Sequence, residues 1–359
     1  MGEAGMKIVV ACGGTGGHVF PGLTTARTLR KRGHNVTVWL SGRGVEESTL
    51  SAWDGPVWRT GAQQLRAKAF FAIVAAVWRC WRKMRRERPQ CLLAMGSYAS
   101  LPPVLAARMC GVPVVLHEAN AVAGKATAFL ARYAKAVAIS FPGSEVSAAA
   151  RRVVHTGLPV RAELAEARER KRGDGEHFTV FVTGGSQGAH AVNELCCAAF
   201  CLLAAEMPQL RVLHQSGAAD VPALRERYAA AGVVAEVVPF VKEMGAAYAA
   251  ADVVVCRAGA VTCAELCLCG VAAILIPLPS AVRDHQRLNA ASLVASGGAV
   301  MIEQATATAE GLAAELRRLA ADSKLLQEMG TALSKVTTAG ADERLAALVE
   351  ECAAMKKGC

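Results

Sequence analysis

The chain has 359 residues, of which 53% are hydrophobic and 19% are charged. A single core rarely grows to this length, so two domains are predicted, and the composition excludes an intrinsically disordered chain. Aromatic residues make up only 5%, which favours parallel strands covered by Ala-rich helices. No apolar window reaches the ~20 residues of a membrane span and no targeting segment opens the chain, so a cytosolic or peripheral protein is expected. The net charge of +10 indicates an anionic surface or a polyanionic ligand.

The first strand, residues 7–12, runs into the glycine-rich loop 13–17. A helix-like stretch then continues to Arg32, and residues 35–40 form the next strand. The same order of strand, glycine loop, helix and strand recurs half a chain later. Its parts are residues 178–183, 184–189, a helix-like stretch to Glu206, and 211–214. Each copy predicts the opening of a βαβ unit.

Short apolar runs bounded by Gly or Pro predict further strands at residues 91–94, 112–116, 137–139, 234–239, 252–256 and 272–277. The fold class is therefore α/β, with two facing, doubly wound Rossmann-like domains that each contain a parallel sheet. We expect domains at 1–160 and 161–338, joined by the hydrophilic segment 162–177. In such sheets ligands bind beyond the carboxyl ends of the strands, so both glycine loops are expected at one shared cleft.

The thirteen cysteines fall mostly inside apolar runs, without a C-x-x-C pair or a His at ligand spacing. We interpret them as buried thiols of a reducing compartment rather than as disulfides or a metal site.

The glycine loops predict phosphate binding, since a helix N-terminus offers backbone N–H groups and the positive end of the helix dipole. They do not fit a nicotinamide site, because Val19 replaces the third glycine of the fingerprint and no acid follows the second strand. The lysine of a Walker A loop and any Asp-x-Asp pair are also missing. We therefore expect no cofactor and no metal. If the ligand is a nucleotide diphosphate, backbone amides and side-chain donors must hold its phosphates.

Six motifs in the same order resemble the MurG family of glycosyltransferases, and they occupy residues 13–22, 95–100, 117–124, 156–161, 184–189 and 256–265. The resemblance implies a GT-B fold and a metal-independent, inverting transfer of GlcNAc from UDP-GlcNAc to the C4 hydroxyl of the muramyl sugar of lipid I. The products would be lipid II and UDP, in peptidoglycan synthesis, with cell-wall or division proteins as further candidate partners. The resemblance also implies that the C-terminal tail, about residues 339–359, packs back on the first domain. The sequence departs from the family at Ser97, Leu101, Ala119 and Thr127.

His18 is the candidate general base for the acceptor hydroxyl, because it follows the first loop and imidazole titrates near neutral pH. The family's similar His is a proposed base. Alternatively, His18 only binds phosphate or caps the helix. Glu118 is a second candidate, either as the base or to orient His18, and it could also be a purely structural carboxylate.

Glu265 is expected to accept from the ribose hydroxyls of UDP, as the resemblance implies, although a helix N-terminus favours a Glu in any case. The resemblance also implies backbone contacts from Ala260, Val261, Thr262, Cys263 and Ala264 to the α-phosphate. Further donor ligands on this basis are Thr15, Gly16, Gly17, Asn120, Arg161, Ser186, Phe240, Val241 and Gln286, the last within a polar cluster with Asp284, His285 and Asn289. Arg161 could instead be an ordinary surface Arg. Contacts to the acceptor and its phosphates are expected from Gly14, Gly96, Tyr98 and Ser100.

Residues 69–78 are apolar and too short to span a membrane, and basic residues flank them on both sides. This pattern predicts binding to an anionic membrane surface through Phe70, Phe71, Trp78, Arg79, Arg82 and Lys83. The resemblance implies that this surface is the cytoplasmic face of the inner membrane. The alternative is a buried helix with a charged, solvated end. Nucleic-acid binding is not expected, because interleaved stacking aromatics are missing.

Two other functions remain open from sequence. A UDP-GlcNAc 2-epimerase shares the fold and would convert the donor without an acceptor. A non-catalytic sugar-nucleotide sensor would keep the donor contacts alone.

Overall fold

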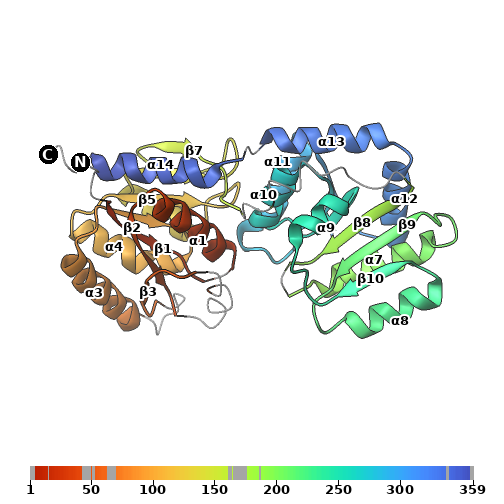
Figure 1. Cartoon of the computed structure of the whole chain (residues 1–359), viewed down its shortest axis with the longest axis horizontal. Helices are drawn as coiled ribbons and strands as arrows, with labels where there is room; N and C mark the ends of the chain where they lie inside the picture. Colours follow the sequence, from red (N-terminus) through yellow and green to blue (C-terminus); the bar gives the residue numbers. More distant parts are fainter. Residues whose placement is uncertain are drawn as a thin grey trace. The chain divides into compact units, whose positions relative to one another are not determined.

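A computed structural model describes residues 5–14, 16–42, 50, 53–62, 70–160, 164, 176–185, 187–336 and 339–355. The chain divides into two compact units. Unit 1 comprises residues 1–161 and 340–359, and unit 2 comprises residues 162–339 (Figure 1). Each unit is an open parallel sheet with helices on both faces, which is the doubly wound arrangement.

The sheet of unit 1 has seven strands in the order β3-β2-β1-β4-β5-β6-β7, and all of its paired neighbours are parallel. The strands are β1 (Lys7–Ala11), β2 (Asn35–Leu40), β3 (Val57–Arg59), β4 (Cys91–Ala94), β5 (Val114–Glu118), β6 (Ala136–Ile139) and β7 (Val153–His155). Strand order reverses at β1 and β4, so the loops that follow these two strands lie at the switch point where such sheets bind ligands.

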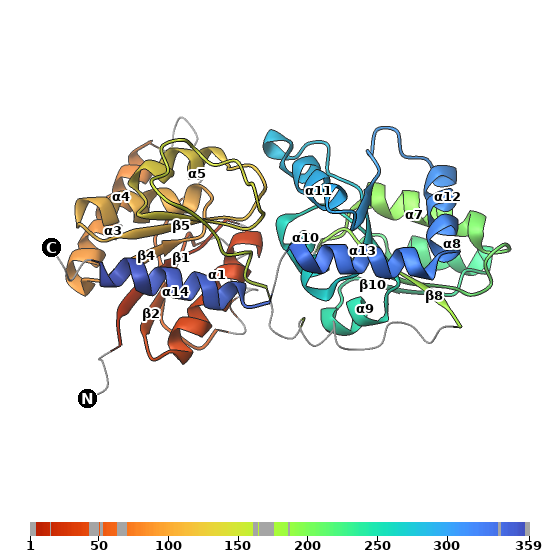
Figure 2. The same ribbon diagram turned by 90° about the horizontal axis from the view of Figure 1, so that it is seen from above.

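Alternate residues of β1 face opposite layers, as the two-residue period of a strand requires. Ile8 and Val10 pack in a core with helices α1 (Gly16–Lys31) and α14 (Ala341–Ala354). Val9 and Ala11 pack in the opposite core with helices α3 (Phe70–Glu87), α4 (Leu101–Met109) and α5 (Lys125–Leu130). The C-terminal helix α14 thus belongs to unit 1, where it packs against α1 (Figure 2).

The sheet of unit 2 has six parallel strands in the order β10-β9-β8-β11-β12-β13. They are β8 (Phe178–Thr183), β9 (Leu210–Gln215), β10 (Ala235–Val238), β11 (Val253–Cys256), β12 (Ala272–Leu275) and β13 (Ala299–Met301). The helices are α7 (His190–Leu203), α8 (Val221–Ala231), α9 (Met244–Ala250), α10 (Ala260–Cys269), α11 (His285–Ala295), α12 (Ala309–Ala320) and α13 (Ser323–Val336).

The apolar runs located the central strands of both sheets but not β3, β7 and β13. These three are edge strands of three residues each, and apart from the buried Ala299 their residues are half-buried or exposed. An edge strand packs on fewer neighbours and needs no continuous apolar run. The expected helix ends are also corrected: α1 ends at Lys31 rather than Arg32, and α7 ends at Leu203 rather than Glu206.

Ten of the twelve described cysteines are buried and all twelve are free thiols. Within the described part of the chain, no group of three or more His, Cys, Asp or Glu is arranged to hold a metal ion. No helix in the same residues is long and apolar enough to cross a membrane.

Candidate active site

His18 lies in the first turn of α1, directly after the first glycine loop. Its Nδ1 lies 2.9 Å from the carbonyl oxygen of Met95, at the end of β4. A carbonyl oxygen only accepts, so Nδ1 carries the hydrogen and the lone pair of the neutral imidazole is on Nε2. This tautomer leaves Nε2 as the nitrogen that can take a proton.

The second loop of unit 1 packs closely against His18. Gly96 has φ +82°, and a Cβ at this position would lie 3.1 Å from the carbonyl oxygen of His117 and 3.7 Å from Cε1 of His18. Ser100 is buried, and its hydroxyl donates to the carbonyl oxygen of Gly96. The Ser100 hydroxyl therefore holds its own loop together, whereas Tyr98 is 37% exposed at the loop surface.

Glu118 ends β5, two residues beyond the predicted strand end, and is buried. Its Oε1 accepts from the backbone N–H and the side-chain amide of Asn120, both at 3.0 Å, and its Oε2 accepts from the N–H of Gly124 at 3.1 Å. Three donors from one loop satisfy both oxygens. This geometry favours Glu118 as the anchor of residues 119–124, with Asn120 held at its side.

His117 is fully buried next to this cluster, and its Nε2 lies 3.3 Å from the carbonyl oxygen of Gly157. Burial lowers the pKa of His117 to about 4, against the opposing influence of that hydrogen bond. His117 is therefore neutral at physiological pH, so it adds no positive charge beside His18.

The glycine loop of unit 2 packs closely against the turn after β9, at Gly188 and Gly217. A Cβ at Gly188, where φ is +75°, would lie 1.9 Å from the carbonyl oxygen of Ser216. A Cβ at Gly217 would lie 2.2 Å from the carbonyl oxygen of Gln187. Gln215 adds a side-chain hydrogen bond of 2.9 Å to the carbonyl oxygen of Gly185. The described residues of the glycine loop are therefore packed and hydrogen-bonded against the end of β9 and the turn that follows it.

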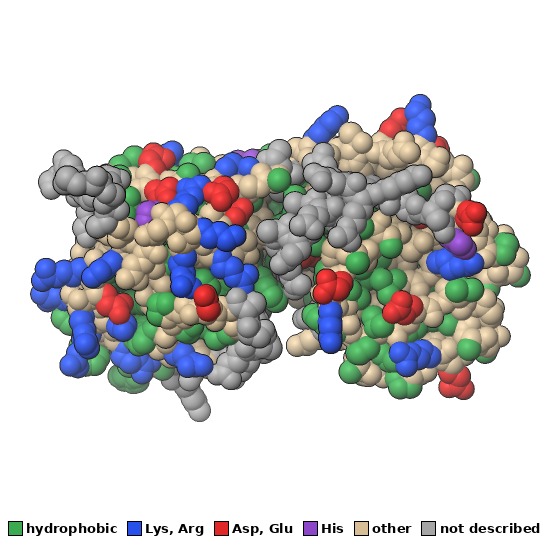
Figure 3. Space-filling model, viewed as in Figure 1, with side chains coloured by type: hydrophobic (Ala, Val, Ile, Leu, Met, Phe, Trp, Pro, Cys, Tyr) green, Lys and Arg blue, Asp and Glu red, His purple; other side chains and the backbone are tan. Residues whose placement is uncertain are grey.

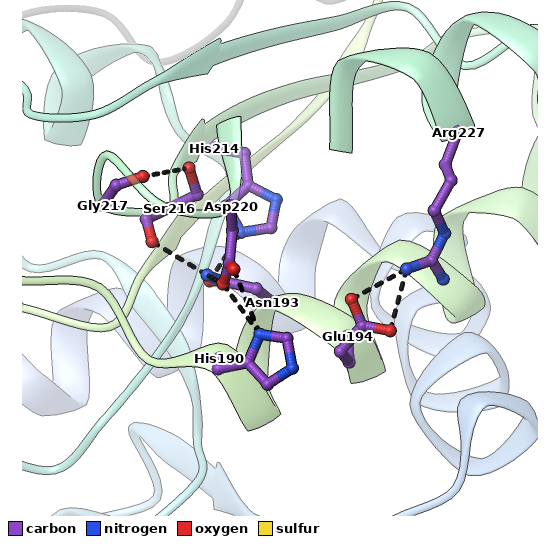
Figure 4. Close-up of polar contacts among 8 residues, drawn as sticks. All are labelled: His190, Asn193, Glu194, His214, Ser216, Gly217, Asp220 and Arg227. Atoms are coloured by element: carbon purple, nitrogen blue, oxygen red, sulfur yellow. Dashed lines mark hydrogen bonds and ion pairs between the residues drawn. The ribbon is translucent and has the colours of Figure 1, made fainter. Parts of the chain in front are cut away.

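A buried polar network supports this turn from below (Figure 4). Asn193 of α7 donates from Nδ2 to the carbonyl oxygen of Ser216 at 2.9 Å and to Asp220 at 2.7 Å. Its Oδ1 lies 3.0 Å from Nε2 of His214, whose Nδ1 lies 2.8 Å from the Tyr228 hydroxyl. Burial lowers the pKa of His214 to about 4.

The network reaches the surface at Asp220. The side-chain hydrogen bonds from Asn193 and then from His190 lower the pKa of Asp220, and the bond to Asp220 raises the pKa of the exposed His190. The apolar patterns around Asn193 and His214 gave no sequence signal for this network.

Helix α10 begins at Ala260, with Gly259 as its N-cap residue. The backbone N–H groups of Ala260, Val261 and Thr262 lie in the first turn, where a helix has no internal acceptors for them. The N–H of Cys263 is already bonded to the carbonyl oxygen of Gly259 at 2.9 Å. The amides of Cys263 and Ala264 follow in the helical ladder, and the phosphate contact expected from them stays a prediction.

Glu265 is buried in the second turn of α10, and its Oε2 accepts from the hydroxyl of Tyr248 at 3.0 Å. Phe240 is exposed and Val241 is buried directly after β10. Gln286 accepts through Oε1 from the N–H of Leu278 at 3.0 Å. Of the expected donor ligands in this part of unit 2, Phe240 is thus exposed, whereas Glu265 and Val241 are buried.

The residues expected to form a polar cluster with Gln286 instead make contacts with different parts of unit 2. Asn289 is fully buried and donates to the carbonyl oxygen of Ala258 at 3.1 Å, and Asp284 forms an ion pair with Arg287. Sequence reasoning also missed Arg257, whose guanidinium donates to the carbonyl oxygens of Ile276 and Pro277, both at 3.1 Å. Arg257 and Asn289 therefore fix the turn that precedes α10.

Three predicted donor ligands, Thr15, Arg161 and Ser186, lie outside the described residues, as does the side chain of Phe70. Most of the hydrophilic segment 162–177 lies outside them as well. Gly16 begins α1 and Gly17 follows it.

Helix α3 has one buried face and one exposed face. Ala76, Cys80 and Met84 are buried four residues apart, which is the spacing of one helix face. On the opposite side, Phe71, Val74 and Trp78 are 83%, 50% and 54% exposed. The exposed face is thus apolar near its start, and Arg82, Arg85 and Arg86 are exposed further along.

Several basic side chains of α3 also contact the protein itself. Arg79 donates to the carbonyl oxygen of Thr60 at 2.9 Å, and Lys83 pairs with Glu87 at 2.7 Å. Arg82 stacks over Trp78, with 5.6 Å between the guanidinium carbon and the ring centroid. One face of α3 is therefore buried, as the alternative interpretation expected. The membrane prediction depends on the opposite, exposed face.

Positive charge is concentrated in unit 1. Its residues include 25 Lys and Arg against 11 Asp and Glu, a formal charge of +14, whereas unit 2 has 15 against 19, a charge of −4. Figure 3 shows Lys and Arg gathered over the surface of unit 1.

Comparison with known proteins covers both units. Residues 8–139 match the glycosyltransferase family 28 N-terminal domain, and residues 179–345 match the family 28 C-terminal domain. A relative from Marinobacter nauticus, named UDP-N-acetylglucosamine--N-acetylmuramyl-(pentapeptide) pyrophosphoryl-undecaprenol N-acetylglucosamine transferase, is 39% identical over 351 residues. These cover 94% of this chain and 95% of the relative. The crystal structure of Acinetobacter baumannii MurG is similar with a TM-score of 0.81 and 33% identity, over 97% of this chain and 99% of that one.

The chain belongs to the MurG family, within glycosyltransferase family 28. This assignment confirms the expected resemblance, the α/β fold class and the class of enzyme. A candidate UDP-N-acetylglucosamine 2-epimerase from Listeria monocytogenes has a TM-score of 0.68 at 13% identity, over 97% of this chain and 96% of that one. At that identity the likeness shows a shared fold only, so it gives the MurG-family chain no epimerase function.

Proposed function

We propose that the chain transfers GlcNAc from UDP-GlcNAc to the C4 hydroxyl of the muramyl sugar of lipid I, giving lipid II and UDP for peptidoglycan synthesis. The observation that carries this proposal is the similarity, over 94% of this chain, to a relative named for this reaction. The two units provide separate surfaces for the two substrates, with the acceptor on unit 1 and the donor on unit 2.

In this proposal His18 is the general base. The hydrogen bond from Nδ1 to Met95 fixes the tautomer and the ring orientation, so Nε2 takes the proton of the acceptor hydroxyl. The oxygen then bonds to the anomeric carbon as the bond from that carbon to UDP breaks on the opposite side. Glu118 acts by holding the loop that carries Asn120.

For the donor, the first-turn amides of α10 and the loop 184–189 would meet the diphosphate, joined by Ser186, Arg161 and the loop residues 15–17. The helix N-terminus provides the electrostatic complement to this charge. The carboxylate of Glu265, oriented by Tyr248, would accept from the ribose hydroxyls, and residues 240–241 would border the uracil. Gln286 and Asn120 would contact the GlcNAc hydroxyls, and Gly14, Gly96 and Tyr98 the acceptor.

Transfer of radiolabelled GlcNAc from UDP-GlcNAc to a lipid I analogue tests this assignment. Wild type should form labelled lipid II, and His18→Ala should lower kcat by about 10²- to 10⁴-fold, the usual contribution of a general base, with an unchanged Kd for UDP-GlcNAc. The exposed His190 of unit 2 supplies the control, since His190→Ala should keep full activity. Donor turnover without acceptor would instead indicate an epimerase, and donor binding without turnover a sensor.

We further propose that the exposed face of α3 binds the cytoplasmic surface of the inner membrane peripherally. The apolar residues Phe71, Val74 and Trp78 would enter the headgroup boundary while the basic end of the helix contacts anionic lipid. Each Lys or Arg near such a surface contributes about 1 kcal/mol, and unit 1 carries the positive charge. Cell-wall or division proteins that bind the enzyme at this surface should co-purify with the lipid-bound enzyme.

Sedimentation with vesicles measures this binding. The wild type should sediment with phosphatidylglycerol-containing vesicles at low salt but not with phosphatidylcholine vesicles. Trp78→Ser should weaken the binding, and the matched control is Leu202→Ser, an exposed apolar residue on a helix of unit 2. Equal binding of both variants would exclude α3 as the contact.

A further inference from the structure

Ser97 has a backbone conformation that normally requires glycine. Its φ is +62° and its ψ is 170°, whereas Arg283 and Asp284, also with positive φ, have ψ near 29° and 26° in the ordinary left-handed region. A side chain in the region of Ser97 costs on the order of 1–3 kcal/mol and persists only where surrounding contacts over-determine it. Contacts of the Ser97 side chain must therefore compensate for this strain.

The compensating contacts come from the Ser97 hydroxyl. It donates to the carbonyl oxygen of Gly13 at 2.9 Å and accepts from the N–H of Ala99 at 3.1 Å. Gly13 belongs to the loop after β1, 84 residues earlier in the chain. A Cβ at Gly14 would lie 3.2 Å from the same hydroxyl oxygen, so the two loops of unit 1 are in direct contact at this point.

This bridge fixes the direction of a peptide plane. In a trans peptide the C=O and the following N–H point in opposite directions. Because the carbonyl of Gly13 points at Ser97, the N–H of Gly14 is directed to the other side. The loop after β4 therefore contacts both the first glycine loop and the start of α1: Ser97 donates to Gly13, and Met95 accepts from His18.

We infer that Ser97 is a positioning residue for the acceptor site, which locks the first glycine loop in the orientation that receives the pyrophosphate of the lipid acceptor. This inference rests on the proposed function, because it assigns the acceptor to unit 1. A glycine at position 97 adopts the same backbone without strain but cannot form the bridge. The loops after β1 and β4 are then no longer joined by this hydrogen bond, and the amide of Gly14 loses its fixed direction.

The test compares Ser97→Gly and Ser97→Ala with wild type. Loss of one hydrogen bond corresponds to about a 2- to 13-fold change in an equilibrium constant. Both variants should raise KM and Kd for a lipid I analogue by this factor, while KM for UDP-GlcNAc stays within twofold. Ser97→Ala keeps the backbone strain and should unfold at a lower temperature than Ser97→Gly. The control is Ser147→Gly, which removes a similar hydroxyl contact to the N–H of Ala149 elsewhere in unit 1.

Unchanged acceptor constants in both Ser97 variants, with normal transfer by wild type, would refute the positioning role alone. An equal rise in both substrate constants would also refute it, because it would indicate a general loss of structure. If wild type neither binds nor transfers to the lipid I analogue, the proposed function fails and this inference fails with it.

Discussion

Replacement of the buried His214 tests the network beneath the second glycine loop (Figure 4). Asn193 Oδ1 can only accept, so Nε2 of His214 donates to it and Nδ1 accepts from the hydroxyl of Tyr228. His214→Phe fills much of the same volume but removes both ring nitrogens, which are the hydrogen-bond partners of Asn193 and Tyr228. It leaves one acceptor and one donor buried without a hydrogen bond.

Each buried group left unsatisfied costs about 1–3 kcal/mol, so His214→Phe should lower the stability of unit 2 by about 2–6 kcal/mol. The exposed pair of His190 and Asp220 gives a contrast, since a surface ion pair is worth about 0–1 kcal/mol. His190→Ala should therefore have little effect. The network holds Ser216, which packs against Gly188 of the glycine loop. Because this loop is proposed to bind the donor, His214→Phe should also bind UDP-GlcNAc more weakly.

The two units can be followed separately. All five tryptophans lie in unit 1, so fluorescence in a denaturant titration reports unit 1 and should be unchanged in His214→Phe. Hydrogen exchange of the peptide 210–215 reports unit 2 and should become faster. Protection of that peptide equal to wild type would refute the reasoning from unsatisfied groups.

The pH dependence provides an independent check. Burial lowers the pKa of His214 from 6.5 to about 4, so the unfolded chain binds more protons than the folded one between these values. Stability is full above about pH 6.5 and is lost as the pH falls to about 4, by about 3 kcal/mol in total. His214→Phe should remove this loss from unit 2, while His117, with the same shift, keeps it in unit 1.

Three further substitutions address the loops and carboxylates. Gly188→Ala should raise Kd for UDP-GlcNAc at least ~10-fold through its contact with Ser216, whereas Gly232→Ala, with a similar positive φ but no atom within 4 Å, should not. Tyr248→Phe removes the donor to Glu265 and should raise KM for UDP-GlcNAc by about 2- to 13-fold; an unchanged KM would show that Glu265 needs no orientation. Glu118→Gln directs an amide group at N–H donors and should lower kcat without shifting its pH profile, whereas loss of the acidic limb of that profile would identify Glu118 as the base.

The interior of both sheets was predictable from sequence, because fully buried parallel strands need continuous apolar runs. The runs at 91–94 and 35–40 coincide with β4 and β2. The glycine loops were likewise predictable, since close backbone packing excludes any Cβ, as at Gly188. These features depend on local residue types, and the local sequence contains that information.

The tertiary structure decided which groups meet across long stretches of chain. The sequence could not show that Met95 selects the tautomer of His18, that Ser97 reaches Gly13, or that Asn193 joins His214 to Ser216. It also left open which side of residues 70–87 is buried, and the packing of α3 leaves Phe71 and Trp78 exposed. A hydrogen bond depends on positions in space that only the packed sheets and helices define. Residue type and spacing could therefore identify candidate site residues but not the contacts between them.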